Sequence, residues 1–193
     1  MPRGKAFQEE EVLKRAMELF WKQGYHATSM QELVDYLGIN RASLYNTFGG
    51  KRALFEQALN LYREANGRIM LRLLHSKTDV REGLRHLFMG AIQGALADKD
   101  KKGCMVVNSC TELLPHDAAL QKVLMQNQTN LENTFYAYLL DGQKRGQIPE
   151  GKDLTAMASL LFTFYNGIKV VSKLSPSQEE LIQQLNLVLS LLD

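Results

Sequence analysis

Between residues 36 and 55 the chain gathers side chains that can contact nucleic acid. This stretch contains Arg41, Lys51 and Arg52 but no Asp or Glu. Arginine donates hydrogen bonds to guanine and to phosphate, while hydroxyl, amide and methyl groups contact phosphates and thymine. Such groups occupy positions 41–47, within one short helical segment. The spacing predicts a helix whose exposed side can enter the major groove of DNA.

Two further helices are predicted before this segment. Apolar residues at helical spacing over positions 12–20 form the stripe of a first helix, which Gly24 ends. Thr28 or Ser29 caps a second helix. Glu32 follows Ser29 by three residues and completes a capping-box pattern.

A glycine turn connects the second helix to the third. Gly38 supplies the turn and Asn40 is a natural N-cap for the third helix, which the glycine pair at 49–50 ends. A long fourth helix is expected over 51–74. Together these elements predict a compact helix-turn-helix head.

Helical periodicity continues through the rest of the chain, with no alternating strand pattern. We expect the remaining helices over 79–97, 104–113, 117–145, 153–173 and 177–192. The predicted fold class is all-α, with a three-helix head joined by the long fourth helix to a helical body. We place the domains at residues 1–52 and 53–193.

Charge and composition narrow the class of protein. The net charge is only +2, but residues 1–52 hold eight Lys or Arg against six Asp or Glu, so the basic excess lies in the head. No apolar run reaches the roughly 18 residues of a membrane span, and the first eight residues lack the apolar core of a signal peptide. We therefore expect a cytoplasmic protein without membrane contact. The two cysteines, Cys104 and Cys110, fit neither a disulfide nor a zinc site, so no metal or cofactor is predicted.

The last two predicted helices, 153–173 and 177–192, are apolar around most of their circumference. A helix that is apolar on all sides must be covered on all sides. Because the body has few helices, we expect a homodimer in which these two helices form a two-fold, four-helix interface. The alternative is a monomer that buries both helices internally.

The motifs of the head together resemble the DNA-binding head of the TetR family of bacterial repressors. The resemblance extends from Leu13 to about Leu59, a quarter of the chain. It rests on Gly24, Thr28, Gly38, Tyr45, Phe48, Lys51, Leu54 and Phe55. The chain departs from the family pattern at Val34 and Leu37, where alanines are usual.

The resemblance implies functional roles for the head. Phosphate contacts are implied for Thr28, Ser29, Tyr45 and Lys51. Approach to bases is implied for Arg41, Ala42, Ser43 and Asn46. The family further implies a dimeric repressor that binds a palindromic operator and is released when a small effector binds in the body.

The effector cavity is likewise implied by the resemblance only. Its candidate lining consists of Met, aromatic and polar side chains of the body: Tyr62, Met70, Phe88, Cys104, Met105, Asn108, Met125, Phe162, Tyr165, Asn166 and Lys169. Cys104 follows Gly103 at the start of a predicted helix, a position that favours a reactive thiolate. This opening is similar to that of TetR proteins that respond to electrophiles or oxidants. The alternative is an inert core thiol.

An enzyme would need a nucleophile and a base within reach of each other. Cys104, Glu112, His75 and His116 are the only candidates, and their spacing matches no known nucleophile-base arrangement. We therefore expect no catalysis. The remaining alternative to a DNA-binding regulator is a small-molecule binding or thiol redox-sensing protein that does not bind an operator.

Overall fold

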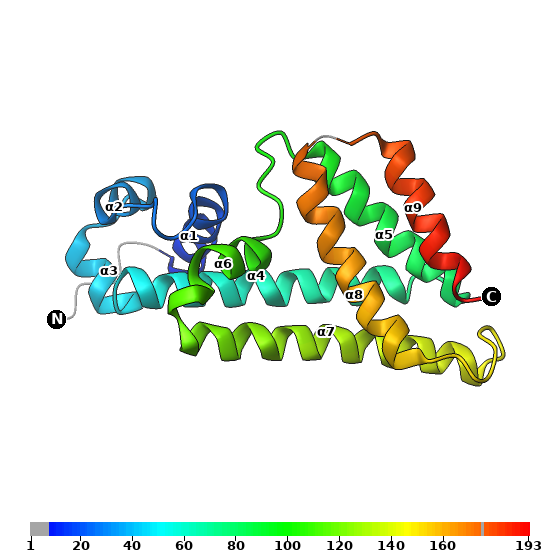
Figure 1. The fold of residues 1–193 in the computed structure, drawn as a ribbon. Coiled ribbons are helices and arrows are strands. Elements are labelled where there is room, and N and C mark those ends of the chain that lie inside the picture. Colours follow the sequence, from blue (N-terminus) through cyan, green and yellow to red (C-terminus); the bar gives the residue numbers. More distant parts are fainter. Residues whose placement is uncertain (1–7, 175) are drawn as a thin grey trace.

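The computed structural model describes residues 8–174 and 176–193, and every regular element in these ranges is helical (Figure 1). In chain order the elements are α1 (Glu9–Gln23), α2 (Met30–Leu37), α3 (Arg41–Phe48), α4 (Lys51–Leu74), α5 (Val80–Ala97), α6 (Met105–Leu113), the 3-10 turn η1 (Leu114–His116), α7 (Ala118–Lys144), α8 (Leu154–Val171), the 3-10 turn η2 (Ser172–Leu174) and α9 (Gln178–Ser190). The all-α prediction is confirmed, and the helices predicted beyond residue 50 differ from the observed ones by at most two residues at either end.

Local sequence explains where the helices of the head begin and end. The Ser29 hydroxyl accepts the backbone N–H of Glu32 at 3.1 Å, and the Glu32 carboxylate accepts the backbone N–H of Ser29 at 3.0 Å. Gly38 ends α2 in the left-handed conformation, with φ of 69°. The Asn40 side chain then accepts the backbone N–H of Ser43 at 2.8 Å and starts α3. The predicted capping box, turn and N-cap are all present.

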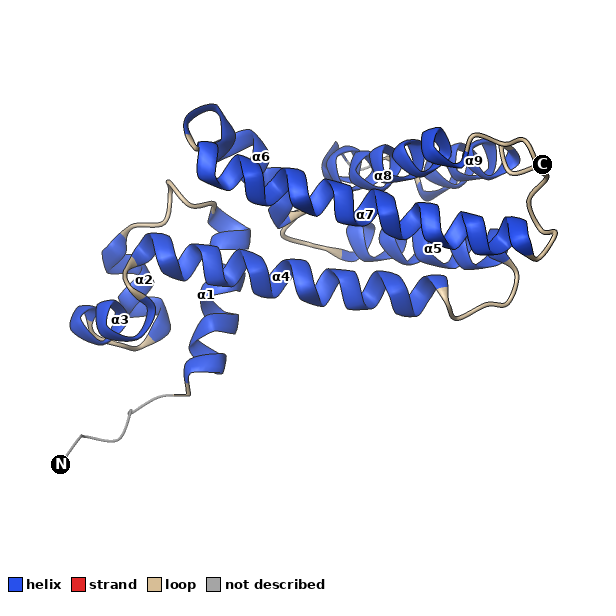
Figure 2. Ribbon diagram, turned by 90° about the horizontal axis from the view of Figure 1, so that it is seen from below, coloured by secondary structure: helices blue, strands red, loops and turns tan. Residues whose placement is uncertain are grey.

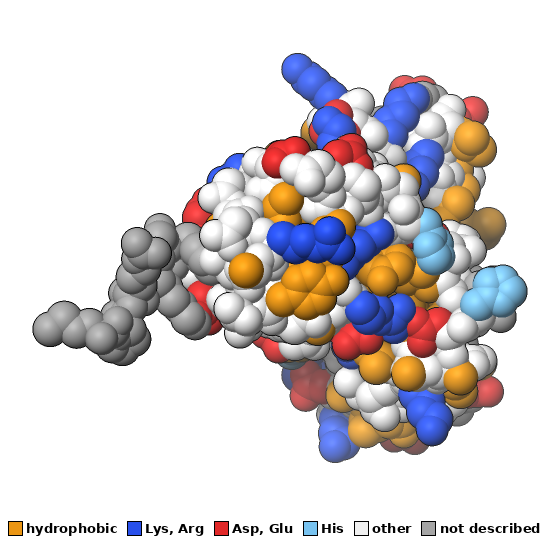
Figure 3. Space-filling model, turned by 90° about the vertical axis from the view of Figure 1, so that its left-hand side faces the viewer, with side chains coloured by type: hydrophobic (Ala, Val, Ile, Leu, Met, Phe, Trp, Pro, Cys, Tyr) orange, Lys and Arg blue, Asp and Glu red, His pale blue; other side chains and the backbone are white. Residues whose placement is uncertain are grey.

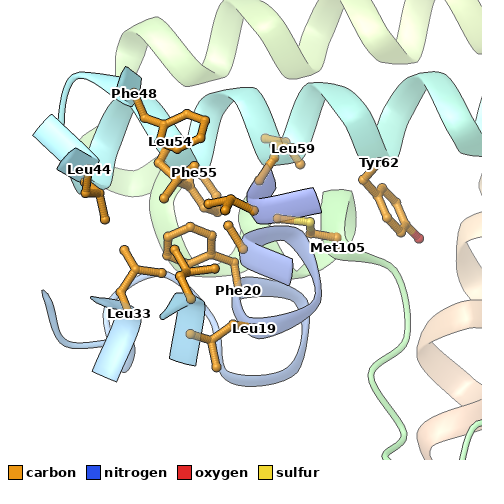
Figure 4. Close-up of a cluster of buried hydrophobic side chains, with 14 of the residues drawn as sticks. Leu19, Phe20, Leu33, Leu44, Phe48, Leu54, Phe55, Leu59, Tyr62 and Met105 are labelled. Carbon is orange, nitrogen blue, oxygen red and sulfur yellow. The ribbon is translucent and has the colours of Figure 1, made fainter. Parts of the chain in front are cut away.

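One hydrophobic cluster, the head cluster, holds α1, α2, α3 and the first part of α4 together (Figure 4). The rings of Phe20 and Phe55 meet edge to face at its centre, with centroids 5.3 Å apart. The cluster also contains Met105 and Leu113 from α6 and Leu120 from the start of α7. The core of the head is therefore completed by segments that follow α5 in the chain.

A second cluster, the body cluster, contains the end of α4 together with α5, α7, α8 and α9. In Figure 1 α5 lies between α8 and α9, and α5 packs against both. Figure 2 shows α4, α5 and α7 extending along the same direction. Like α7, α4 contributes side chains to both clusters, so it is one of two long helices that connect them. The predicted division between residues 52 and 53 falls at the start of this helix and stays a prediction.

The segment Leu154–Leu174 is the one described helix that length and composition alone would allow to cross a membrane. Its inner side packs into the body cluster through Leu161, Tyr165 and Ile168. Its outer side leaves Leu160 and Val170 exposed by 40% and 48%. The segment is thus a core helix with one uncovered apolar face.

Candidate nucleic-acid interface and ligand cleft

Helix α3 lies at one end of the molecule, which Figure 3 views directly. Leu44 and Phe48 point into the head cluster. The opposite side of the helix carries the exposed or half-exposed side chains of Arg41, Ala42, Ser43, Tyr45 and Asn46. The Arg41 guanidinium lies 6.0 Å from the centre of the Tyr45 ring. Hydrogen-bond donors and a cation therefore stand together on one accessible helix face.

Lys51 lies at the start of α4, beside this face. Its Nζ is 4.4 Å from the centre of the Tyr25 ring. Partial burial lowers the pKa of Lys51, while the nearby carboxylates of Glu112 and Glu32 act in the opposite direction. The preceding Gly50 provides no side-chain cap. The first backbone amides of α4 and its positive end are therefore available to a phosphate beside a lysine.

The two predicted phosphate contacts before α2 lie in different environments. Ser29 is exposed at the N-cap of α2. Thr28 is fully buried, and its hydroxyl donates to the carbonyl oxygen of Gly24 at 2.7 Å. The Thr28 hydroxyl therefore connects the end of α1 to the start of α2, and the phosphate contact implied for Thr28 stays a prediction.

Glu112 of α6 forms an unforeseen connection to the loop between α1 and α2. Its carboxylate accepts the backbone N–H groups of Tyr25 at 3.1 Å and His26 at 2.6 Å. Gly24 lies against the same carboxylate, and a Cβ at this position would come within 2.8 Å of Oε2. We call this arrangement the Glu112 clasp. It fixes the loop that leads into the helix-turn-helix from an element outside it.

A second connection joins α4 to α7. The Arg52 guanidinium lies 2.5 Å from Asp117, whose side chain also caps α7 by accepting the backbone N–H of Leu120. That backbone hydrogen bond is the main reason why the pKa of Asp117 is lowered, and Arg52 contributes further. Arg52 is also bonded to Glu56 on its own helix. The Arg52 charge is thus paired with carboxylates of the protein. By contrast, the Lys51 ammonium has no carboxylate within 4 Å in the described residues.

A cleft of about 340 Å³ opens where the head meets the body, and we call it the junction cleft. Trp21 of α1 and Tyr62 of α4 form walls on the side of the head, and Tyr165 and Lys169 of α8 face them from the body. The remaining lining residues are Asn66, Ile69, Leu73, Leu87, Gly90, Ala91, Gly94, Ala95, Asp98, Lys102 and Gly103. This lining is mainly apolar, with a few polar groups, as is typical of small-molecule sites.

Three of the predicted pocket residues, Tyr62, Tyr165 and Lys169, line the junction cleft. Cys104 and Asn166 line a cavity of about 20 Å³ that also touches Tyr165 and Lys169. The structure does not place the other six in the junction cleft. Met70 and Phe88 are fully buried in the body cluster, Phe162 packs against it, Met105 belongs to the head cluster, Asn108 bonds to Lys102 and Lys173, and Met125 is 60% exposed on α7.

Four of these six residues, Met70, Phe88, Met105 and Phe162, lie outside the junction cleft for one physical reason. Residue type and helical spacing identify large side chains on inward faces, and most such side chains fill cores. Met125 differs, because α7 has no covering helix on that side and the residue points to solvent. A role for Met125 in the effector pocket stays a prediction.

Cys104 is the N-cap of α6, as expected, but it is only 3% exposed. Burial, and after it the neighbouring Cys104, raises the pKa of Tyr62. Cys110 is half-buried, and burial raises its pKa. The environment of Cys104 fits the inert-thiol alternative better than that of an accessible, reactive cysteine.

His75 and the candidate nucleophile Cys104 lie in different parts of the structure. His75 is exposed and lies against Tyr138 of the body cluster, whereas Cys104 belongs to the head cluster. Glu112 is occupied by backbone amides. Within the residues that the structure describes, no group of three His, Cys, Asp or Glu side chains could hold a metal ion.

Sequence reasoning missed Trp21, Lys102 and the small residues of α5 in the junction cleft. A signal was present for the small residues, because Gly90, Ala91, Gly94 and Ala95 repeat at helical spacing on one side of α5 and leave space beside it. No comparable signal marked Trp21, whose position depends on how α1 meets the loop before α6.

Comparisons with known proteins agree with this geometry. The family model described as "Bacterial regulatory proteins, tetR family" matches residues 12–58, and "Tetracyclin repressor-like, C-terminal domain" matches residues 80–186. The chain is 34% identical over 195 residues to the uncharacterized HTH-type transcriptional regulator YezE of Bacillus subtilis, covering 100% of both chains. It is 32% identical over 183 residues to the HTH-type transcriptional repressor ComR of Escherichia coli, covering 94% of this chain and 87% of ComR.

A solved structure of similar fold is a cysteine mutant of the TetR family transcriptional regulator CifR, complexed with 26-bp double-strand operator DNA. It superposes with a TM-score of 0.87 at 28% identity, covering 97% of this chain and 98% of that one. Both halves of the chain thus match the same family, in sequence and in fold. This chain belongs to the TetR family of DNA-binding transcriptional regulators.

Proposed function

We propose that the chain is a homodimeric, cytoplasmic repressor that binds a palindromic operator through α3 and leaves it when an effector occupies the body. It acts without catalysis. The observation that carries the proposal is the exposed face of α3, where Arg41, Tyr45 and Asn46 stand beside the amide-rich start of α4. No Asp or Glu interrupts the sequence from Tyr36 to Phe55. CifR, the relative of similar fold, is complexed with operator DNA in its solved structure.

The chemistry of each side chain indicates whether it contacts bases or phosphates of the DNA. Arg41 stands at the N-terminal end of α3 and has the donors that recognise guanine, with Ala42, Ser43 and Asn46 beside it. Phosphates are contacted by Lys51, Tyr45 and Ser29 and by the first backbone amides of α4. Residues 1–52 form the DNA-binding domain and residues 53–193 the ligand-binding and dimerisation domain.

Fluorescence anisotropy with labelled DNA from the promoter region of the gene tests these assignments. Lys51→Ala should weaken binding to all sequences and reduce the salt dependence by about one phosphate contact. Arg41→Ala should cost about 1–3 kcal/mol at its base pair and relax the preference there. Lys99→Ala, which removes an exposed lysine of the α5–α6 loop, is the matched control and should bind like the parent. Parent-like binding by both head variants would contradict the contact assignment.

The dimer is proposed from the uncovered face of α8 and α9. Leu160 and Val170 on α8 are 40% and 48% exposed. Leu187 on α9 and Leu191, which directly follows α9, are 70% and 46% exposed. A second copy related by a two-fold axis would cover these residues with the same pair of helices, giving a four-helix interface. Leu187→Glu should then shift the protein to monomers in sedimentation experiments. Val123→Glu places the same charge at an exposed apolar residue of α7 and should leave the dimer intact.

Repression requires that the effector distinguish two arrangements of the heads. A ligand that favours one arrangement shifts operator affinity by its difference in binding energy, typically about 1–3 kcal/mol. The junction cleft is suited to this role because α4 and α1, both elements of the head cluster, line one side of it. Cys104 takes no part in this version of the mechanism, so Cys104→Ser should keep effector response.

A further inference from the structure

The lining of the junction cleft combines flat aromatic side chains with a few charged groups, and together these indicate a class of ligand. Three aromatic residues, Trp21, Tyr62 and Tyr165, line it from three different helices. On the side of α5 the lining consists of small residues, and a Cβ at Gly94 would meet nothing within 4 Å. A planar, apolar molecule is the shape that such walls accept.

The charges in the cleft favour an anion. Lys102 Nζ lies 4.3 Å from the Trp21 ring centre and 3.1 Å from Glu18, so its charge is already paired. Lys169 Nζ lies 4.1 Å from the Tyr165 ring centre, and no carboxylate stands within 4 Å of it in the described part of the chain. A cationic ligand would be repelled by the ammonium groups of Lys102 and Lys169, which already lie over the rings of Trp21 and Tyr165.

The acidic residue in the lining does not offset this preference. The Asp98 carboxylate accepts the backbone N–H of Lys102 at 2.7 Å, which directs it to the loop between α5 and α6. Lys169 is therefore the group in the cleft best placed to pair with a ligand, and an ammonium beside an apolar wall binds carboxylates well.

The same cleft is also where the head is attached to the body. The Trp21 indole N–H donates to the carbonyl oxygen of Gly103 at 3.0 Å, which joins α1 to the α5–α6 loop. Gly103 has φ of 69° and packs against α8, since a Cβ there would lie 2.3 Å from Lys173 Cε and 3.1 Å from the Lys169 carbonyl oxygen. The Lys102–Glu18 ion pair joins α1 to the same loop. A molecule in the cleft thus touches groups that fix α1.

We propose that the junction cleft binds a planar apolar carboxylate, with its carboxylate at Lys169 and its ring against Trp21, and that this ligand acts on the head through α1. The proposal rests on the regulatory function proposed above, which it makes specific. It differs from a change carried by α4 alone, because Trp21 and Glu18 belong to the first helix of the head.

Trp21 is the only tryptophan of the chain, so its fluorescence reports directly on the cleft. Titration of the full-length protein with benzoate and phenylacetate should change the Trp21 emission saturably. The corresponding neutral amides, which have the same shape, should bind at least about tenfold more weakly. Calorimetry repeats both titrations without dependence on an optical signal. Equal affinity of carboxylate and amide, or heat and emission changes absent with all four compounds, would overturn the proposal.

Two variants locate the anion and the coupling. Lys169→Met keeps the length of the side chain and should lower carboxylate affinity about tenfold, while Lys99→Met should not change it. Trp21→Phe keeps an aromatic wall but removes the indole N–H. By calorimetry it should bind benzoate within about threefold of the parent, yet benzoate should no longer weaken its operator binding. If Lys169→Met bound benzoate as tightly as the parent, the carboxylate would not lie at Lys169. If benzoate still weakened operator binding by Trp21→Phe, the ligand would not act through the Trp21 contact.

The DNA measurement separates this proposal from the function beneath it. If the parent protein without ligand binds no operator DNA, the proposed function fails whatever happens in the cleft. If the parent binds operator but benzoate neither binds nor weakens that binding, the ligand proposal alone fails.

Discussion

The head and the body use apolar surface in opposite ways. The head cluster encloses most apolar side chains of α1, α2 and α3, and the outer side of α3 carries Arg41, Ser43 and Asn46 together with Ala42 and Tyr45. In the body, α8 and α9 bury one side and leave a second apolar side exposed. A closed core whose outer face carries a cation and hydrogen-bond donors suits contact with DNA, whereas an open apolar face suits a second apolar face. The DNA contact and the proposed dimer contact therefore fall on surfaces of different chemistry.

The comparison also shows that the two regions are not independent. Cys104, Met105 and Leu113, at or within α6, are buried in the head cluster although they follow α5 of the body. The Glu112 clasp and the Trp21–Gly103 hydrogen bond cross the same border. Events in the body therefore have at least two routes to the head besides α4.

The largest effect is expected from Phe20→Ala, which empties the centre of the head cluster. Such a truncation lowers the free energy of unfolding by about 3–5 kcal/mol. Since α6 completes this cluster, amide hydrogen exchange should accelerate in Met105–Leu113 as well as in α1. Phe88→Ala is the matched change in the body cluster, and it should instead accelerate exchange first in α5 and α9. If amide exchange in α6 accelerated in Phe88→Ala and not in Phe20→Ala, α6 would belong to the body.

A smaller effect is expected from Gly83→Ala, which tests how tightly the body is packed. The added Cβ would lie 1.9 Å from the Tyr138 hydroxyl and 2.4 Å from the Leu74 carbonyl oxygen, two groups that are bonded to each other. Breaking this contact should destabilise the protein by about 1–3 kcal/mol in denaturant unfolding. Gly67→Ala is the control, since a Cβ there meets nothing within 4 Å and should raise stability by up to about 1 kcal/mol. Equal effects of the two substitutions would refute the packing argument.

Comparison of sequence and structure shows which features follow from local chemistry. Ser29, Gly38 and Asn40 each act on residues close to them in the chain, so the helix-turn-helix could be predicted in detail. The exposed face of α3 followed from the same spacing. The sequence did not indicate the hydrogen bond from the Thr28 hydroxyl to Gly24, because this contact depends on how the loop folds back and not on residue type.

Features that depend on long-range packing were not accessible in this way. Trp21 meets Gly103, and Glu112 meets Tyr25 and His26, across more than 80 residues of sequence. Helical periodicity says which side of a helix is buried, but it does not say against what. For this reason the body's helices were predicted well, while four of the predicted pocket residues, Met70, Phe88, Met105 and Phe162, lie in or against the two hydrophobic clusters.

The Glu112 clasp provides an intermediate effect. Glu112→Ala removes the charged acceptor of two backbone hydrogen bonds. A hydrogen bond to a charged group contributes about 1–3 kcal/mol to the free energy of unfolding, and less where water can take the place of the lost acceptor. Because both amides lie in the loop before α2, operator affinity should fall together with stability. Glu150→Ala, in an exposed turn of the body, should alter neither quantity. Loss of stability without loss of operator affinity would show that the clasp is a structural contact only.

The smallest effect compares two capping boxes, one in each region. Ser29 and Glu32 form the box of α2, and Ser177 and Glu180 form that of α9. In the head box, the hydrogen bond from Ser29 is the main reason why the pKa of Glu32 is lowered from its ordinary value of 4.5. This contribution is therefore fully present above that value and is lost as the pH falls through the lower pKa of the folded state. Glu32→Gln should reduce the loss of stability on acidification.

Replacing the two capping serines separates stability from DNA contact. Ser29→Ala and Ser177→Ala should each lower the free energy of unfolding by about 1 kcal/mol, because each removes the acceptor for the backbone N–H three residues on. Only Ser29→Ala also removes a hydroxyl from the proposed phosphate-binding side, so operator affinity should fall in this variant and stay unchanged in Ser177→Ala. Equal loss of affinity in both would mean that stability alone governs binding. That outcome would remove Ser29 from the interface and leave the head's recognition to α3 and the start of α4.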